Sequence, residues 1–372
     1  MGVEVKQITT RREKREFIYL PTRIHRSHPG WVPPIYVDEW RFLNPKKNRA
    51  FSHCETTLAL AFRDGHVVGR IMGIINNRYN EQRHEKTARF GCLECFEEQE
   101  VAHSLLGYVE QWARERGMRK IVGPMGFSDQ DPEGFLVEGF EHEPALATYH
   151  NFQFIIHFLE ADGYTKDVDF AVYKIPVPAK IPKFYEKIST RVRKRSTYSL
   201  VEFTRRRELK PFIRPILQLM NETFRSLSGF TPLDDKEMSD LARRYLPIID
   251  PRFVKVVTAD NQMAGFIVGV PNMNEGLRKA NGRLLPFGWF HVINAKRKTR
   301  RLDLLLGGIK ERHRGRGVDV LLGGAMLRTA QSAGFDYIDS HHELESNFRV
   351  RAEMERLGGE VYKRYRIFQK RL

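Results

Sequence analysis

The chain has 372 residues, enough for two domains that each bury a core, and its 41% hydrophobic and 29% charged residues are typical of a globular protein. A formal net charge of +16 predicts a surface that attracts polyanions such as nucleic acid, anionic lipid or a phosphorylated cofactor. Three cysteines are too few for a disulfide framework, and no run of about 18 apolar residues is present, which argues against a secreted scaffold and a membrane-spanning protein. We expect a cytoplasmic protein, with peripheral contact at the inner membrane surface left open.

The first half of the chain contains a hairpin pattern that the second half repeats. Two apolar runs within residues 57–75 flank a dipeptide typical of tight β-hairpin turns, and residues 253–270 repeat this pattern. The pairs that share a spacing of 196 positions are Asp64/Asp260, Gly69/Gly265, Gly73/Gly269, Asn151/Asn347 and Gly163/Gly359. Because the same spacing recurs at both ends of the halves, the sequence predicts a duplicated unit.

Each half continues with an amphipathic helical pattern and a short strand, within residues 101–123 and 318–340. A strand-like tail closes each half, at residues 167–175 and 362–369. We therefore expect an α/β (α+β) chain of two tandem domains, each with a mixed, mostly antiparallel sheet flanked by helices. The expected boundaries are 1–178 for the first domain, 179–199 for a linker and basic helix, and 200–372 for the second. The alternative is a chance likeness, since unrelated α/β domains also share hairpins and helices.

Glycine and polar residues are dense between residues 123 and 151, which predicts a long ordered loop in the first half. Loops of this kind often carry a binding function. We expect this loop to line a substrate pocket, with Glu138, His142 and Tyr149 as the binding residues. The alternative is that the loop only packs the two halves together.

The most specific signal is a loop rich in arginine and glycine at residues 310–317, between a strand pattern and a helical pattern. Such a loop directs several backbone N–H groups to one point, and the helix dipole adds partial positive charge. This is the chemistry of a diphosphate site, although a solvated turn is the alternative. The corresponding residues 96–103 of the first half are acidic and lack glycine, so we expect one site only.

The spacing of this loop separates it from other phosphate loops. It lacks the Gly-Lys-Ser/Thr of nucleotide-triphosphate loops and the three glycines of dinucleotide folds. Arg312-x-x-Gly315-x-Gly317 resembles the R/Q-x-x-G-x-G/A signature of the GNAT (Gcn5-related N-acetyltransferase) superfamily, specifically over residues 253–372. The resemblance implies two GNAT-like domains, the first degenerate, and an acyl-CoA co-substrate (acetyl-CoA or a long-chain acyl-CoA) in a V-shaped opening of the sheet. The residues that it assigns to acyl-CoA are Ile309, Arg312, Arg314, Gly315, Arg316, Gly317, Val318 and Asn347.

Acyltransferases of this superfamily use a free amine as nucleophile, so a general base is expected after the next strand. Three candidates lie there: His342, Glu343 and Glu345, of which we favour the first two. The alternative is that Glu345 caps the helix that follows and that the histidines only pack. Many relatives carry the acid for the leaving thiolate as a tyrosine on that helix. This helix has none, so we expect the thiolate to leave unassisted.

Further segments resemble a narrower group. HPGWVPP at residues 28–34, Gly123-Pro124 and LVEGF at residues 136–140 are similar to GNAT-like proteins that include bacterial ceramide synthases. That resemblance implies transfer of a fatty acyl group to a sphingoid-type lipid amine, which a basic enzyme reaches at an anionic membrane surface. A small-molecule amine fits the derived features equally well.

Two other classes of function were weighed. The main rival is a non-catalytic tandem GNAT-like module that binds CoA or a partner without turnover. A nucleic-acid binder rests on charge alone, and because no nucleic-acid module is recognisable, no specific nucleic acid is expected. Cys92-x-x-Cys95 has no second ligand pair nearby, so no metal is expected either.

Overall fold

The structure is a computed structural model that describes residues 2–181, 183–195, 197–225, 227 and 229–372. Residues 182 and 196 of the predicted linker therefore lie outside the described residues. The elements of the first half, in chain order, are β1 (Glu4–Gln7), α1 (Arg11–Ile24), α2 (Tyr36–Phe42), η1 (Arg49–Ser52), β2 (Cys54–Arg63), β3 (His66–Asn76), α3 (Asn77–Arg83), β4 (Thr87–Cys95), α4 (Gln99–Glu115), β5 (Lys120–Gly123), β6 (Phe135–Glu138), α5 (Phe154–Ala161) and β7 (Thr165–Pro176).

The helix α6 (Lys183–Arg195) occupies the predicted linker. The elements of the second half are β8 (Tyr198–Glu202), α7 (Arg206–Phe224), α8 (Asp235–Tyr245), η2 (Pro251–Phe253), β9 (Val254–Ala259), β10 (Gln262–Pro271), α9 (Asn274–Lys279), α10 (Gly288–Lys298), β11 (Arg301–Ile309), η3 (Glu311–His313), α11 (Val318–Ser332), β12 (Tyr337–Asp339), β13 (Glu343–Leu344), α12 (Phe348–Arg356) and β14 (Glu360–Arg371). Both halves thus run hairpin, strand, helix, strand, helix, strand, as the repeated spacing predicts, and in each half a strand and two helices precede the hairpin.

The hairpin turns show why the two halves share a sequence pattern. Asp64 and Gly65 have φ values of 50° and 76°, and Asp260 and Asn261 have φ values of 50° and 62°. Positive φ at both turn residues defines the type I′ turn, whose twist matches that of the flanking antiparallel strands. Glycine, Asn and Asp adopt this conformation at least cost, so the turn chemistry alone places both hairpins.

The shared glycines reflect close packing of a helix on each hairpin. A Cβ atom added to Gly69 would lie 2.8 Å from the Cγ1 atom of Val101 in α4. The equivalent atom on Gly265 would lie 3.0 Å from the Cγ1 atom of Val318, the first residue of α11. Glycine therefore lets the helix after the fourth strand of each half begin directly against the sheet.

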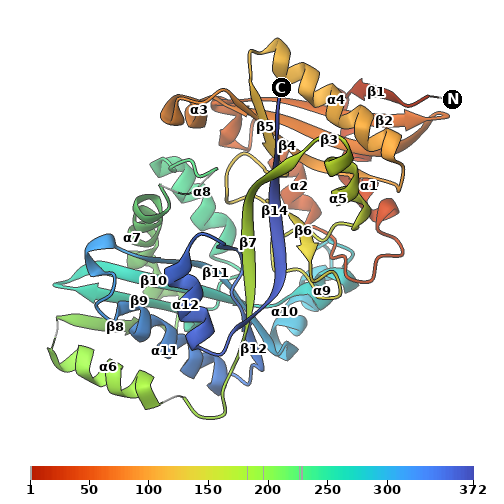
Figure 1. Cartoon of the computed structure of the whole chain (residues 1–372). Helices are drawn as coiled ribbons and strands as arrows, with labels where there is room; N and C mark the ends of the chain where they lie inside the picture. The colour runs from red at the N-terminus through yellow and green to blue at the C-terminus, as the bar shows by residue number, and fades with distance from the viewer. Residues whose placement is uncertain (1, 182, 196, 226, 228) are drawn as a thin grey trace.

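All the main strands join one continuous sheet in the order β1-β2-β3-β4-β5-β14-β7-β12-β11-β10-β9-β8. The order shows that the halves exchange their last strands: β14, the C-terminal strand, pairs with β5 of the first half, and β7 pairs with β12 of the second. The two exchanged strands also pair with each other along their length. Figure 1 shows them side by side at the centre of the molecule.

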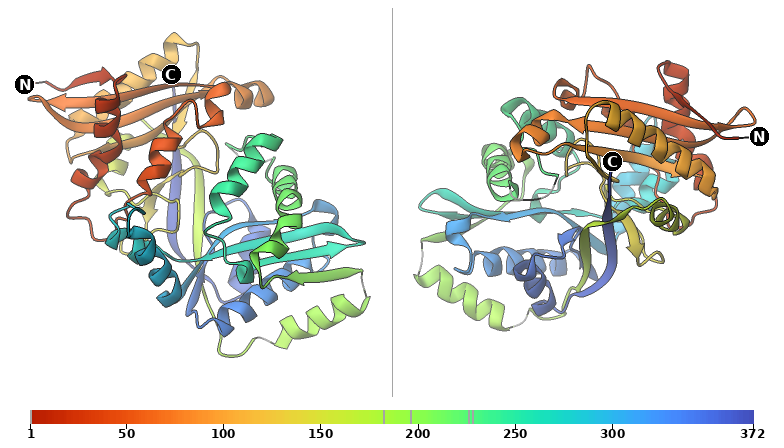
Figure 2. Two further views of the ribbon diagram at one scale, coloured as in Figure 1. Left: turned by 180° about the vertical axis from the view of Figure 1, so that it is seen from behind. Right: turned by 45° about the horizontal axis from the view of Figure 1, so that its top comes forward.

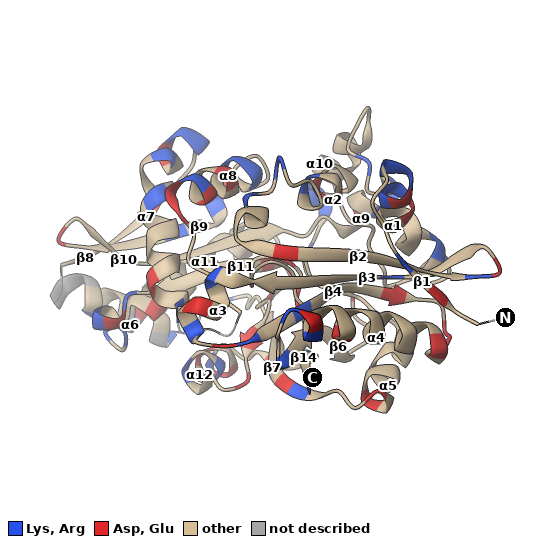
Figure 3. Cartoon of the chain, turned by 90° about the horizontal axis from the view of Figure 1, so that it is seen from above, with Lys and Arg blue, Asp and Glu red and all other residues tan. Residues whose placement is uncertain are grey.

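Helices cover both faces of this sheet. Figure 3 shows α1, α2, α7, α8 and α10 on one side of the strands and α4, α5, α6 and α12 on the other. The further views in Figure 2 show the same arrangement, with the first half above the second. Within the described residues, no helix is long and apolar enough to cross a bilayer.

Candidate active site

The candidate site is an opening between β11 and β12. These parallel strands pair only from Arg301 to Asp303 on β11, whereas β11 remains paired with β10 as far as Ile309. The chain after β12 turns away, and β13 pairs with β7 instead. Residues 304–309 of β11 therefore present one row of backbone N–H and C=O groups to the opening, where a ligand can accept hydrogen bonds.

The loop at residues 312–318 lies at the end of β11, next to this opening. Gly315 has a φ of 70° and Gly317 a φ of 87°, and both values favour glycine. The first bond of α11 runs from the amide of Leu321 to the carbonyl oxygen of Gly317, over 3.1 Å. The amides before Leu321 thus form the N-terminal end of a helix of more than four turns, which is a suitable place for a phosphate group.

The three arginines of the loop have different surroundings. The Nε atom of Arg314 donates to the carbonyl oxygen of Ile309 over 3.1 Å, which ties the loop to the end of β11. An Nη atom of Arg312 donates to the side chain of Gln262 over 3.0 Å. Arg316 is exposed. The loop thus carries three exposed guanidinium groups close in sequence to the helix end, and Val318 packs that end against Gly265.

The helices α11 and α12 approach each other. Asn347 is the N-cap residue of α12, and among the described residues its side chain caps no amide of that helix. The pKa of Glu353 on α12 is raised by burial and by the nearby carboxylate of Asp319 on α11, which shows that the two helices approach each other.

Glu343 is the candidate base that the structure favours. It is half-buried on β13, the short strand that follows β12 and pairs with β7. Burial raises the pKa of Glu343 to about 8. A carboxylate with this pKa is a strong enough base to accept a proton from an amine near neutral pH. Its proton affinity comes from desolvation, since burial is the one cause of the shift.

His342 and Glu345 have surroundings that suit structural roles better. The His342 ring packs on Phe170 and Tyr365, and burial lowers its pKa well below the ordinary value, so it is a weak base. The carboxylate of Glu345 bonds to Lys166, which lowers its pKa and keeps it ionised. It also pairs with Arg364, so it does not cap α12 as the alternative supposed.

A buried charge cluster lies where β11 and β12 part, and the sequence analysis missed it. Asp339 is fully buried and pairs with Arg301 at 2.8 Å and with Lys363 at 3.0 Å. The hydroxyl of Tyr362 also donates to it. Burial alone would raise the pKa of Asp339, but the charges of Lys363 and Arg301 outweigh it and hold the pKa well below its ordinary value. Arg301 belongs to a basic run, residues 296–301, that ends α10 and begins β11.

The two tyrosines of β14 bear on the question of the missing acid. The hydroxyl of Tyr362 donates a hydrogen bond to the Asp339 carboxylate, and the pKa of Tyr362 is raised by burial and by that carboxylate. Tyr365 is fully buried, and burial raises its pKa as well. Both tyrosines of β14 therefore have hydrogen-bond partners within the protein, Asp339 for Tyr362 and Thr148 for Tyr365.

The predicted substrate loop of the first half reaches the second half. The carbonyl oxygen of Leu146 lies 3.0 Å from the Nε2 atom of His341, and that of Glu143 accepts from Lys363 over 3.0 Å. His142 packs on Tyr362, with ring centroids 4.9 Å apart. The loop therefore borders the closed end of the opening, where an acceptor would approach.

The other two predicted substrate residues lie away from His142. Glu138 is exposed and pairs with Arg364 at 3.0 Å, which links it to the surface network of Glu345. Tyr149 remains in the first half, where it packs on Phe135 and contacts the backbone of Cys92 on β4. The structure therefore brings only His142 close to the opening, and Tyr149 fills the corresponding space of the first half.

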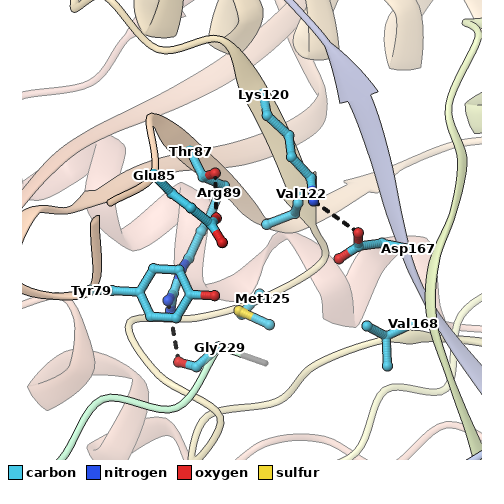
Figure 4. A pocket seen from close by; sticks show the side chains of 10 residues that line it. All are labelled: Tyr79, Glu85, Thr87, Arg89, Lys120, Val122, Met125, Asp167, Val168 and Gly229. Atoms are coloured by element: carbon cyan, nitrogen blue, oxygen red, sulfur yellow. Dashed lines mark hydrogen bonds and ion pairs between the residues drawn. The ribbon is translucent and has the colours of Figure 1, made fainter. Parts of the chain in front are cut away.

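The first half has no equivalent of the glycine loop in its described residues. Only residues 96–98 join β4 to α4, and Glu98 and Glu100 at the start of that helix pair with Arg63. A small cavity of ≈ 110 Å³ lies near β4 and β5, lined by residues that include Arg89, Met125 and Gly229 (Figure 4). None of the predicted site residues lines this cavity. The carboxylates of Glu98 and Glu100 at the start of α4 would repel a diphosphate, whereas the start of α11 carries the glycine loop.

Fold and site together define a tandem GNAT protein. The sequence model of the acetyltransferase (GNAT) family matches residues 23–124, in the first half, which keeps the strands of the family without its loop. A solved tandem GNAT protein from the clavulanic acid biosynthesis pathway has a TM-score of 0.57 at 14% identity, covering 100% of this chain and 98% of that one. A GCN5-related N-acetyltransferase from Sphaerobacter thermophilus has a TM-score of 0.53 at 12% identity, covering 99% and 95%. These two similarities concern the fold.

The chain belongs to the GNAT family and is an N-acyltransferase with an acyl-CoA co-substrate. A protein named bacterial ceramide synthase, from Caulobacter vibrioides (strain NA1000 / CB15N), is 30% identical over 382 residues, covering 100% of this chain and 98% of that protein. Protein YghO from Escherichia coli (strain K12) is 26% identical over 377 residues, covering 99% and 95%. Both relatives match along the whole chain, including the first half. Among the described residues no group of His, Cys, Asp and Glu has the arrangement of a metal site.

Proposed function

We propose that this chain transfers a fatty acyl group from acyl-CoA to the amine of a sphingoid-type lipid. The observation that carries the proposal is the similarity over the full length to a protein named bacterial ceramide synthase, together with one glycine loop beside an opening in the sheet. Apolar residues suit a fatty chain: Leu305 and Leu306 lie on the open part of β11, and Leu344 lies on β13. All three are half-buried, so they offer apolar surface to a ligand.

In this proposal the glycine loop and β11 bind acyl-CoA, and Glu343 accepts the proton of the amine. The amides of the loop and the charges of Arg312, Arg314 and Arg316 hold the diphosphate. Backbone groups of residues 304–309 donate to the thioester oxygen, on which negative charge develops. Glu343 accepts the proton of the amine as its nitrogen bonds to the acyl carbon and the bond from carbon to sulfur breaks. The thiolate leaves without an acid.

The acceptor and the acyl group are tested together by thiol release from a panel of acyl-CoA substrates. Acetyl-CoA and palmitoyl-CoA are each offered to sphinganine and to a water-soluble primary amine. The proposal expects the fastest release with palmitoyl-CoA and sphinganine. Faster turnover of acetyl-CoA with the soluble amine would replace it by a small-molecule acetyltransferase. No release with any pair, while CoA still binds, would favour the non-catalytic alternative.

Glu343→Gln tests the base. We expect kcat to fall about 100-fold, because general-base catalysis contributes at least this much. The parent rate should rise with pH and level off above about pH 8, where Glu343 becomes deprotonated, and the variant should lack this limb. The acceptor amine titrates equally in both proteins, so the difference belongs to Glu343.

The same substitution provides its own control for folding. The raised pKa of Glu343 stabilises the folded state below the ordinary pKa of a glutamate and loses this stabilisation as pH rises through about 8. At pH 8.5 the variant should therefore resist urea at least as well as the parent. A pH profile identical to that of the parent would remove Glu343 from the mechanism.

A further inference from the structure

The second half carries an insertion that the first half lacks. Residues 272–300 join β10 to β11 and form α9 and α10, whereas residues 77–86 at the same place of the first half form the short helix α3. An added Cβ at Gly276 would lie 2.6 Å from the carbonyl oxygen of His291, so α9 and α10 pack tightly together. The insertion is therefore a compact unit with a fixed orientation on the sheet.

Its inner face packs beside the opening. Met273, Leu277 and Val292 are buried there, and half-buried Leu305 of β11 and Leu146 of the substrate loop pack against them. Both of these leucines border the candidate active site. The insertion therefore holds the side of the opening in place.

Its outer face is apolar and exposed. Five large hydrophobic side chains lie on it, with exposed fractions between 41% and 81%: Leu285, Phe287, Trp289, Phe290 and Ile293. Outside this insertion the large hydrophobic residues with comparable exposure are Val37 and Phe348, among the described residues. A concentration of aromatic and aliphatic residues on one short segment marks an interaction site.

Cations surround this apolar face. Arg283 and Arg297 are exposed within the insertion, and neither forms an ion pair with a carboxylate of the described residues. Lys and Arg are also numerous on the neighbouring helices α1, α7 and α8, on the same side of the sheet (Figure 3). Aromatic residues that enter the headgroup region, ringed by cations that meet anionic lipid, are typical of interfacial membrane binding.

We propose that α10 and the turn before it dock this enzyme on an anionic membrane surface, with Trp289 and Phe290 inserted among the lipids. The net charge of +16 complements such a surface, whereas a second copy of this chain would bring a like charge to the same face. Docking in this orientation would place the opening, which the inner face of the insertion borders, close to the membrane. The proposal holds whichever amine is the acceptor.

Vesicle co-sedimentation tests the docking surface. The parent should bind vesicles of phosphatidylcholine with 30% phosphatidylglycerol at low salt. Its tryptophan fluorescence, to which Trp289 contributes beside three other tryptophans, should shift to shorter wavelength, and the shift should be lost when Trp289 is replaced. Trp289→Ser combined with Phe290→Ser should reduce binding about tenfold or more, since both side chains are exposed and their removal leaves the core intact. Phe348→Ser removes an equally exposed aromatic residue from α12 and should bind as the parent does.

Two further measurements separate the outcomes. Arg283→Gln with Arg297→Gln should weaken binding to anionic vesicles and leave the weak binding to pure phosphatidylcholine unchanged. Thiol release with a water-soluble amine should stay at the parent rate in the Trp289 and Phe290 variant, which separates loss of docking from loss of catalysis. Unchanged vesicle binding in this variant would overturn the proposal. So would light scattering that shows the substitutions converting a dimer to a monomer.

Discussion

Gly315→Asp is expected to weaken CoA binding by about 1,000-fold, because opposing like charges at close range costs several kcal/mol. Gly315 has a φ of 70°, which aspartate tolerates better than most residues, and no heavy atom lies within 4 Å of an added Cβ. The side chain thus fits without displacing its neighbours, while its carboxylate stands where the loop directs its amides. Isothermal titration calorimetry with CoA gives the affinity.

The chain offers a matched control for this substitution. Gly65 in the first hairpin has a φ of 76° and equally open surroundings, so Gly65→Asp carries the same strain and charge at a distant position. It should bind CoA with the parent affinity. Gly315→Ala should fall between the two, because it adds conformational strain without charge. Parent-like affinity of Gly315→Asp would show that the diphosphate binds elsewhere.

Asp339→Ala is expected to destabilise the fold by about 3–5 kcal/mol, the usual cost of leaving a buried charge without its partner. The substitution leaves Lys363 with no carboxylate and Arg301 with Asp303 alone. Urea denaturation at neutral pH measures the change in the free energy of unfolding. Because the pKa of Asp339 is held well below its ordinary value, its contribution is complete at neutral pH and is lost only in acid.

An exposed pair provides the comparison. Asp336 bonds to Arg300 at 2.6 Å, but more than half of each side chain is exposed. Asp336→Ala should therefore cost below about 1 kcal/mol. Combining Asp339→Leu with Lys363→Met should recover part of the loss, because the second substitution removes the unpaired cation. An equal loss in the free energy of unfolding for the Asp339 and Asp336 variants would show that the buried ion pairs stabilise the fold no more than the exposed pair does.

Local chemistry explains what the sequence could predict. Asp64-Gly65 defines a turn through its own φ preferences, and the Gly315-x-Gly317 spacing defines a helix entry in the same way. Neither feature depends on distant parts of the chain. The two hairpins and the repeated order of elements were therefore predictable. The GNAT family model, in contrast, matches residues 23–124 of the first half, where the sequence predicted only a degenerate copy.

Partners that lie far apart in the chain explain what was missed. In the sequence, Arg301 belongs to a basic run that is typical of a surface segment. In the fold it is buried beside Asp339 of β12, which also pairs with Lys363 of β14. The strand exchange could not be predicted because β7 and β14 have similar sequence patterns. Either strand could pair with β5 or with β12. Glu343 and Glu345 look alike in sequence, yet one is half-buried on β13 and the other joins the surface charges of Lys166.

Because of the exchanged strands, the two halves cannot be separated into two intact domains. A cut through α6 would not release two proteins, because the fragment 1–178 would keep β7 without β12 and leave the edge of β5 bare. Open strand edges of this kind recruit other chains. The halves are thus interlocked, because each contributes its last strand to the sheet of the other. Residues 123–151 and the glycine loop are thus connected by continuous strand pairing, and moving the two halves apart would require breaking the pairs that β7 and β14 form.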